Sequence, residues 1–249
     1  MSKNHIVFLH GFLENSSMWK PVLNRISKTP FEIHLPELPG HGNRAPLPAG
    51  ARIEDFADDV LSQLPLEKSE SVIFIGHSMG GYVACNIARR YPQKIKALCL
   101  FHSKAGCDDA EKKAARDRAV AAAEENKALY LRTMISGLFS SNSREKLHDT
   151  IESMIEEAKQ MEVAAIQNAL MAMKRREDEV ETLINRDFPL FYFLGDQDPS
   201  LPMHVMESEL QRLPGAAYLV VPGIGHMGHF ENTSISGEFI QRILRSLNT

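Results

Sequence analysis

The feature that most constrains this chain is a Gly-x-Ser-x-Gly motif at residues 76–80, which follows a β-branched apolar run and leads into a helical pattern of small residues. A serine hydroxyl is a weak nucleophile at its ordinary pKa, so a nucleophilic serine must stand on a tight turn that a histidine can reach. Gly76 and Gly80 suit that turn because they tolerate its dihedral angles and leave space for a substrate. The motif therefore predicts a strand, a turn that carries a nucleophilic Ser78, and a helix. A plain structural turn is the alternative.

The composition narrows the class of protein. A chain of 249 residues that is 43% hydrophobic and 24% charged can bury one substantial core. Its net charge of -4 gives no indication of a basic surface, and we therefore expect no nucleic-acid partner. Three cysteines without metal-ligand spacing, an N-terminus without signal-peptide features and no stretch of transmembrane length favour a cytoplasmic protein that is not an integral membrane protein.

Short apolar runs alternate with helical patterns along most of the chain, which indicates βαβ units and an α/β fold with a mostly parallel central sheet flanked by helices. The apolar runs lie at 5–10, 31–35, 71–76, 95–102, 188–194 and 217–221, and the helical patterns at 52–64, 79–91, 203–213 and 234–247.

Residues 107–186 show no strand pattern, and alanine, methionine and paired charges recur there at helical spacing. We interpret 107–186 as an inserted helical cap, and 1–106 with 187–249 as the core. Methionine packs adaptably, so the methionines of this segment fit either plain core or a substrate pocket. The candidates for a pocket are Met134, Leu138 and Phe139.

A nucleophilic serine needs a base. His226 lies on a glycine-flanked loop directly after the last apolar run, and it is the candidate base. His229 is the alternative. A metal site made of this histidine pair lacks further ligands at a recognisable spacing, so we expect no metal.

The acid that orients the base is expected after the preceding apolar run, where Asp196 and Asp198 are both available. We favour Asp198 as the acid and interpret Asp196 as a turn-capping residue. The end of the strand before the insertion carries His102 and no competing carboxylate.

Acyl transfer also needs two backbone N–H groups that bind the developing oxyanion. Met79, the residue after the nucleophile, is expected to supply one, and Phe12, in the loop after the first strand, the other. The histidines at 10, 41 and 77 are interpreted as hydrogen-bonded framework residues.

These motifs together resemble the α/β-hydrolase superfamily, in particular its cap-bearing esterase and lipase-like members. Residues 10–12 resemble the family's oxyanion motif, 38–42 its Pro-Gly-His-Gly loop and 76–81 its nucleophile elbow, and the acid and base motifs are similar to 195–198 and 225–226. The resemblance implies the α/β-hydrolase fold, and its Gly-x-x-Asp spacing selects Asp198 over Asp196. The cap matches the family least.

The expected function is that of a cofactor-independent serine hydrolase, which cleaves small to medium carboxylic esters through an acyl-enzyme on Ser78, His226 and Asp198. One alternative is a lyase of the menaquinone-pathway type, whose elbow usually carries Tyr before the serine and Arg after the paired glycines. This chain has His77 and Tyr82 at those positions. The other alternative is a non-catalytic ligand receptor or scaffold on the same fold.

Overall fold

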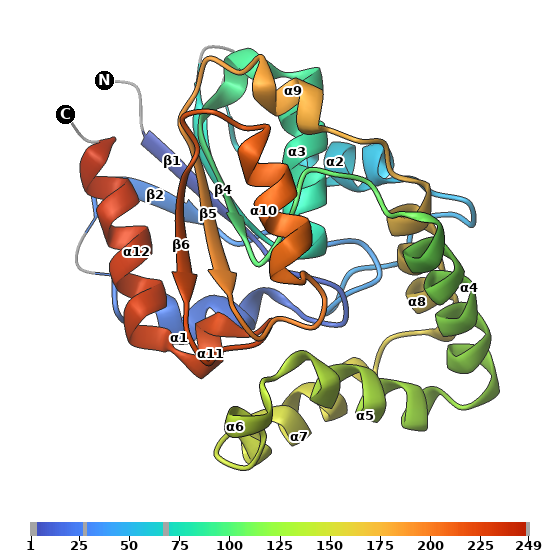
Figure 1. Cartoon of the computed structure of the whole chain (residues 1–249). Helices are drawn as coiled ribbons and strands as arrows, with labels where there is room; N and C mark the ends of the chain where they lie inside the picture. Colours follow the sequence, from blue (N-terminus) through green and yellow to red (C-terminus); the bar gives the residue numbers. More distant parts are fainter. Residues whose placement is uncertain (1–3, 27–28, 67–69, 248–249) are drawn as a thin grey trace.

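The computed structural model describes residues 4–26, 29–66 and 70–247, and within them six strands form one sheet in which every neighbouring pair is parallel (Figure 1). The strands are β1 (Asn4–Leu9), β2 (Phe31–His34), β3 (Val72–His77), β4 (Ile95–Phe101), β5 (Leu190–Gly195) and β6 (Ala217–Val221). Their order in the sheet is β2-β1-β3-β4-β5-β6. The α/β fold and the parallel sheet expected from the sequence are confirmed.

Helices cover both faces of the sheet. They are α1 (Lys20–Leu23), α2 (Ile53–Ser62), α3 (Met79–Arg90), α4 (Ala110–Glu125), α5 (Lys127–Leu138), α6 (Ser141–Arg144), α7 (His148–Ala158), α8 (Val163–Arg175), α9 (Val180–Ile184), α10 (Met203–Gln211), α11 (Gly228–Glu231) and α12 (Thr233–Ser246), with short 3-10 turns at Ser16–Trp19 and Pro92–Lys94. None of the helices in the described part of the chain has the length and apolar character needed to span a bilayer.

The core has two layers because side chains alternate between the faces of each strand. In β1, Ile6 and Phe8 pack with residues of α1 and α12, whereas Val7 and Leu9 pack with residues of α2 and α3. Figure 1 shows the same arrangement, with α1 and α12 on one side of the sheet and α2, α3 and α10 on the other.

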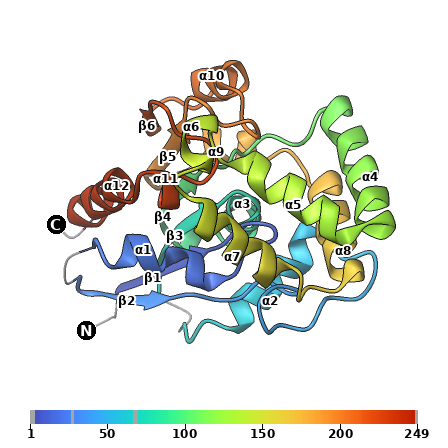
Figure 2. The same ribbon diagram turned by 90° about the horizontal axis from the view of Figure 1, so that it is seen from below.

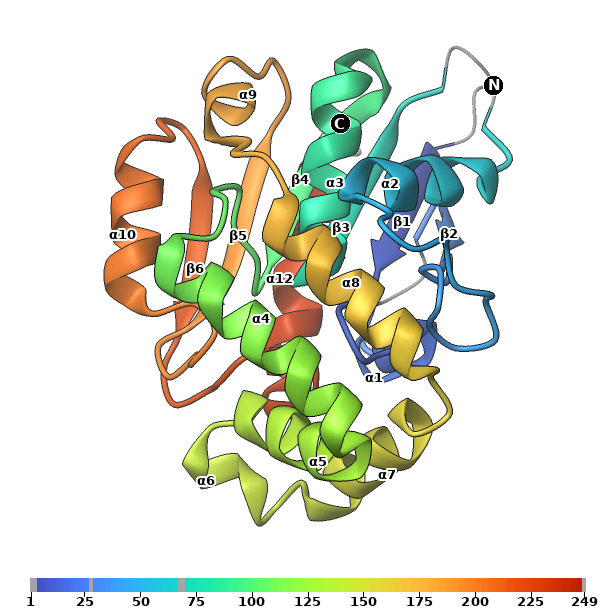
Figure 3. The same ribbon diagram turned by 90° about the vertical axis from the view of Figure 1, so that its right-hand side faces the viewer.

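Six helices, α4 to α9, lie between β4 and β5, and this segment contains no strand. Helix α4 packs against α8, α5 packs against α7, and α8 reaches α2 (Figure 3). Figures 1 and 2 place α5, α6 and α7 beyond the carboxyl ends of the strands. Helix α9 instead packs against α3 of the sheet layer. The division of the chain into a core and a cap stays a prediction.

Parallel pairing brings the loops at the carboxyl ends of the strands to one edge of the sheet, where α/β proteins bind ligands. The last residues of neighbouring strands pair with one another, as His77 does with Phe101 and Gly195 with Val221. The loops after β1, β3, β4, β5 and β6 therefore meet, and these loops carry the residues singled out in the sequence.

Candidate active site

Ser78 is the single residue between the end of β3 and the start of α3, and its backbone is strained, with φ 49° and ψ -116°. A positive φ is uncommon for a residue other than glycine and persists only where the surroundings enforce it. Here the N–H of Ser78 donates to the Phe101 carbonyl at 3.1 Å, and its carbonyl accepts from the Ser103 hydroxyl at 2.7 Å. These bonds hold the turn in place and present Ser78 at the sheet edge.

The glycines of the motif are required by close backbone packing. A Cβ added to Gly76 would lie 2.5 Å from the backbone nitrogen of Gly81, and one added to Gly80 would lie 2.6 Å from the carbonyl oxygen of His10. Real Cβ atoms do not approach backbone atoms so closely, so any side chain at these positions would force strand and helix apart. The turn therefore depends on both glycines.

Asp198 and His226 are joined by a short hydrogen bond, with 2.7 Å between Oδ2 and Nδ1. The other carboxylate oxygen of Asp198 accepts the backbone N–H groups of Ser200 at 2.8 Å and Leu201 at 3.1 Å. Burial alone would raise the pKa of Asp198, but the charge and hydrogen bonds of its histidine neighbours outweigh burial and hold it well below the ordinary value. An ionised Asp198 fixes the proton of His226 on Nδ1 and leaves Nε2 free to accept one.

His102, at the end of β4, contacts the same carboxylate oxygen, with its Nδ1 3.1 Å from Oδ2 of Asp198. It is fully buried and has φ 45°. Burial lowers the pKa of His102 to about 4 despite the neighbouring carboxylate, so the ring is uncharged at neutral pH. The sequence places His102 at this strand end but does not predict its contact with Asp198, because its only sequence signal is its place at the end of a buried strand.

The alternative acid and base lie elsewhere. Asp196 accepts the N–H of Gly223 at 2.6 Å and so holds the turn after β6. His229 is fully buried and packs against Trp19 and Phe230, and burial lowers the pKa of its ring well below the ordinary value. Neither residue lines the cavity that contains Ser78.

Two clusters in the described part of the chain bring three metal-ligating atoms within 4.8 Å of one another. One is the hydrogen-bonded set His102, Asp198 and His226, and the other is His5, Glu32 and His34 at the opposite edge of the sheet. His229 belongs to neither cluster, so the structure does not bring the histidine pair of the sequence analysis together with further ligands.

The two expected oxyanion donors lie beside Ser78. Phe12 lines the same cavity, and a Cβ on its neighbour Gly11 would lie 3.2 Å from the Cβ of Ser78. Met79 is the first residue of α3, where backbone N–H groups have no partner within the helix and the helix dipole is positive. Within the described residues, the N–H groups of Phe12 and Met79 donate to no backbone carbonyl. Both are available to an anion.

A buried ion pair behind the nucleophile was missed by the sequence analysis. Oε2 of Glu14 accepts the N–H of Gly11 at 2.5 Å and lies 2.9 Å from Nδ1 of His77, whose Nε2 donates to the carbonyl of His226 at 3.0 Å. Burial opposes both charges, but the two groups stabilise each other, so the pKa of Glu14 is lowered and that of His77 is raised. The pair connects the loops after β1, β3 and β6.

The remaining histidines named from the sequence serve the framework. His10 donates from Nδ1 to the Gly11 carbonyl at 2.8 Å and accepts the N–H of Leu38 on Nε2 at 3.0 Å. His41 contacts the Pro39 carbonyl at 3.0 Å, and burial lowers its pKa to about 3. Together they tie the loop after β2 to the loop after β1.

Ser78 and His226 line one cavity of about 170 Å³, which lies between the strand-end loops and the insertion. Met134 and Leu138 line it as well, whereas Phe139 does not and instead stacks on Phe230 with 6.5 Å between ring centroids. The full lining is Phe12, Glu14, His77, Ser78, Tyr82, Lys112, Ala115, Arg116, Ala119, Tyr130, Met134, Leu138, Leu170, Met173, Ser200 and His226.

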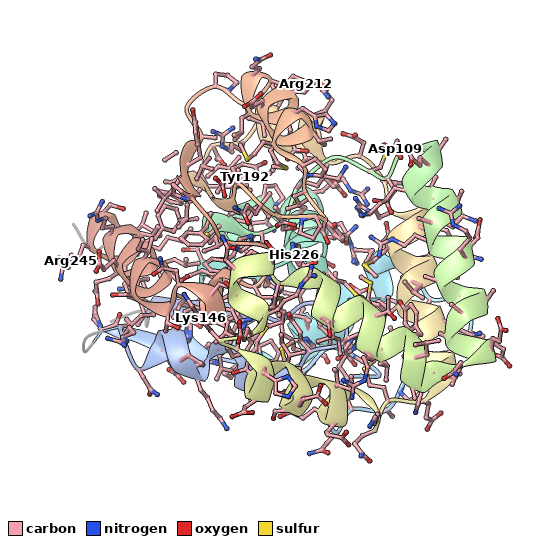
Figure 4. The ribbon with its side chains drawn as sticks, turned by 60° about the horizontal axis from the view of Figure 1, so that its bottom comes forward. Asp109, Lys146, Tyr192, Arg212, His226 and Arg245 are labelled. Atoms are coloured by element: carbon pink, nitrogen blue, oxygen red, sulfur yellow. The ribbon has the colours of Figure 1, made fainter. Side chains whose placement is uncertain are left out.

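The loop that carries His226 is anchored on the insertion. The N–H of His226 donates to the Leu138 carbonyl at 2.8 Å, and the carboxylate of Glu231 accepts N–H groups from both Gly225 and Ser140 at 3.0 Å. Figure 4 shows His226 at the centre of the molecule, beside the ribbons of α5 and α6. The position of the candidate base therefore depends on how the insertion sits on the sheet.

Comparisons with known proteins agree with this fold. A family model described as alpha/beta hydrolase fold matches residues 4–233. The pimeloyl-acyl-carrier-protein methyl ester esterase of Proteus mirabilis (strain HI4320) is 38% identical over 101 residues, which are 41% of this chain and 37% of that protein, so the match spans little more than a third of this relative.

Two further relatives match over nearly their whole length. The 2-succinyl-6-hydroxy-2,4-cyclohexadiene-1-carboxylate synthase of Enterobacter sp. (strain 638) is 25% identical over 244 residues, 96% of this chain and 91% of that protein. The solved structure of a thermophilic esterase from Thermogutta terrifontis, with malate bound, is 26% identical and superposes with a TM-score of 0.89, covering 99% of this chain and 91% of that one.

Proposed function

The chain belongs to the alpha/beta hydrolase family, and on that premise we propose that it is a serine hydrolase that cleaves small to medium carboxylic esters. Ser78 is the nucleophile, His226 the base, and Asp198 the acid that orients the base. The observation that carries the proposal is the 2.7 Å hydrogen bond between Asp198 and His226 beside a cavity that Ser78 also lines. A nucleophile, a base and an orienting acid around one cavity is the arrangement that acyl transfer needs.

The reaction runs in two halves. Oγ of Ser78 attacks the ester carbonyl while its proton passes to Nε2 of His226, and the N–H groups of Phe12 and Met79 bind the oxyanion. The carbon–oxygen bond to the alcohol then breaks, and His226 returns the proton to the departing alkoxide. A water molecule, deprotonated by His226, then attacks the acyl-enzyme. His226 returns this proton to Oγ of Ser78, and the carboxylic acid product leaves.

The cavity supports a small substrate. Its volume of about 170 Å³ is below the ~300–1,000 Å³ that pockets for drug-sized ligands occupy, and most of its lining is apolar. The thermophilic esterase that superposes over nearly the whole chain supports ester cleavage as the reaction. All three cysteines are unpaired, which supports a cytoplasmic location.

A lyase on the same residues is the second candidate, because one relative that matches over nearly its full length bears the name of a carboxylate synthase. His77 and Tyr82 argue against it, because they lie at the positions where such lyases usually carry Tyr and Arg. The side chain of His77 moreover forms the buried ion pair with Glu14 that is described above.

The test is a panel of p-nitrophenyl esters from acetate to palmitate, followed in the pre-steady state. A hydrolase gives a burst of one p-nitrophenol per chain and then steady turnover. We expect the best kcat/KM for short and medium acyl groups. A protein that releases no p-nitrophenol from any ester in the panel would contradict the proposed function and favour the lyase or a non-catalytic receptor.

A further inference from the structure

One wall of the cavity that contains Ser78 is basic. Helix α4 supplies Lys112 and Arg116, which are four residues apart and so lie on one helix face, and α5 supplies Tyr130. The two helices pack against each other in the insertion (Figure 3). Three polar side chains that can donate hydrogen bonds therefore face a cavity that is otherwise mostly apolar.

Several hydrogen-bond donors of this wall have no acceptor within the described part of the chain. Tyr130 is more than nine-tenths buried, and its hydroxyl has no hydrogen-bond partner. Arg116 is buried as well and donates from Nε to Asp108 at 3.1 Å, which leaves its two terminal NH₂ groups without an acceptor. A buried polar group without a partner costs free energy, so an acceptor on a bound ligand would stabilise the Tyr130 hydroxyl, and the terminal NH₂ groups of Arg116 offer further donors beside it.

The charges around this wall do not balance. Asp108 lies between Arg116 and Arg176, at 3.1 and 2.8 Å, so one buried carboxylate serves two guanidinium groups. Lys112 adds a third positive charge, and no ion pair of its ammonium group occurs among the described residues. The carboxylate that lines the cavity itself, Glu14, is paired with His77. The wall therefore carries excess positive charge.

Burial shifts the pKa values of two groups in this wall. Burial and the nearby Arg116 lower the pKa of Lys112, and the carboxylates of Asp108 and Asp198 offset this only in part. Burial raises the pKa of Tyr130 to about 12, so its hydroxyl stays protonated and can donate.

We propose that Lys112, Arg116 and Tyr130 form an anion subsite that binds a carboxylate carried by the ester, so that the preferred substrates are half-esters of short dicarboxylic acids. This specificity rests on the proposed function, because it assumes that the ester carbonyl lies at Ser78. The terminal NH₂ groups of Arg116 and the hydroxyl of Tyr130 donate to the carboxylate oxygens, and Lys112 neutralises the remaining charge. The apolar lining accommodates the chain between the two ends.

The first experiment measures binding without turnover. Isothermal titration calorimetry of Ser78→Ala compares monomethyl glutarate, which carries a carboxylate, with dimethyl glutarate, which does not. We expect the half-ester to bind at least about tenfold more tightly, the size of effect that charge-assisted hydrogen bonds produce. Adding Lys112→Met and Tyr130→Phe should remove that difference, whereas adding Lys113→Met, one residue further along the same helix and away from the cavity, should preserve it.

Arg116 is not substituted in these variants because its Nε donates a hydrogen bond to the buried carboxylate of Asp108. Tyr130→Phe removes only a hydroxyl that has no partner in the described structure, so the melting temperature should not fall. Equal binding of the two esters, or a preference for the half-ester that survives Lys112→Met and Tyr130→Phe, would overturn the subsite.

The second experiment separates the subsite from the reaction. Intact enzyme is assayed with the same two esters, and we expect kcat/KM to favour the half-ester by about tenfold or more. Selective binding in calorimetry without hydrolysis of either ester would uphold the subsite and contradict the proposed function. Hydrolysis of both esters at equal kcat/KM would uphold the proposed function and contradict the subsite.

Discussion

His102 and His226 direct their Nδ1 atoms at the same carboxylate oxygen of Asp198, at 3.1 and 2.7 Å. The second oxygen of Asp198 is occupied by two backbone N–H groups. The carboxylate is therefore fixed from both sides, and under the proposed function His102 would position the acid. It does not line the cavity that contains Ser78.

This relationship makes His102 testable by a matched pair of variants. His102→Ala removes one donor to an ionised carboxylate and should lower kcat about tenfold with little change in KM. His102→Asn should recover most of the loss, because its amide nitrogen takes the place of Nδ1 and asparagine tolerates a positive φ. Equal kcat losses in both variants, at unchanged melting temperature, would argue against a positioning role.

The same substitution at the two aspartates of the loop after β5 should lower kcat to very different extents. Asp198→Asn removes the acceptor that fixes the imidazole tautomer of His226, and kcat should fall by about 10³–10⁴-fold. Asp196→Asn weakens only the bond to the N–H of Gly223 and should leave kcat within a few fold. Steady-state kinetics on p-nitrophenyl acetate compare them, and a larger loss in Asp196→Asn would mean that the acid is misassigned.

The Glu14–His77 pair should contribute to stability over a defined pH window. The lowered pKa of Glu14 means that its contribution is present above its unfolded value of 4.5 and is lost as the pH falls. The raised pKa of His77 means that its contribution is full below the unfolded value of 6.5 and is lost as the pH rises through the folded value. The pair therefore stabilises the fold most between these two values.

Urea unfolding of the wild type and Glu14→Gln at pH 5.5 and pH 9 measures this contribution. At the lower pH, removing one partner of a buried pair should cost about 3 kcal/mol of unfolding free energy. The difference should shrink as the pH rises through the raised folded pKa of His77, because uncharged His77 no longer compensates the buried carboxylate. A difference that stays constant across this range would show that the two groups are not an ion pair.

Met134 and Met154 distinguish a pocket residue from a core residue within the insertion. Met134 lines the cavity, so Met134→Ala should enlarge it and shift the preferred p-nitrophenyl ester to a longer acyl chain, by a few fold in kcat/KM per methylene. Met154 is buried in the hydrophobic core and does not line that cavity. Met154→Ala should lower the unfolding free energy by about 2–5 kcal/mol and leave the chain-length profile unchanged. An unaltered profile in Met134→Ala would favour the core interpretation of both methionines.

The parts of this structure that the sequence predicted are those encoded locally. The strand before Ser78, the turn and the helix after it follow from residue types that are adjacent in the chain, and Gly76 and Gly80 are glycines because backbone atoms lie where their side chains would be. The order of apolar runs and helical patterns likewise indicated a parallel sheet. The candidate residues lie in the loops at the carboxyl ends of its strands.

The parts that the sequence did not predict depend on which strands are neighbours. Glu14 and His77 are 63 residues apart and meet because β1 pairs with β3, and His102 and Asp198 are 96 apart and meet because β4 pairs with β5. The basic wall requires α4 to lie against α5 over the strand ends. Periodicity within a segment carries no information about such pairings.

The central claim is that Ser78 is the nucleophile, and intact-protein mass spectrometry after treatment with a fluorophosphonate tests it most directly. The account predicts one adduct per chain in the wild type, located on Ser78 by peptide mapping, and none in a Ser78→Ala variant that melts at the wild-type temperature. An adduct that persists in Ser78→Ala, or a wild-type protein that stays unlabelled, would contradict the account.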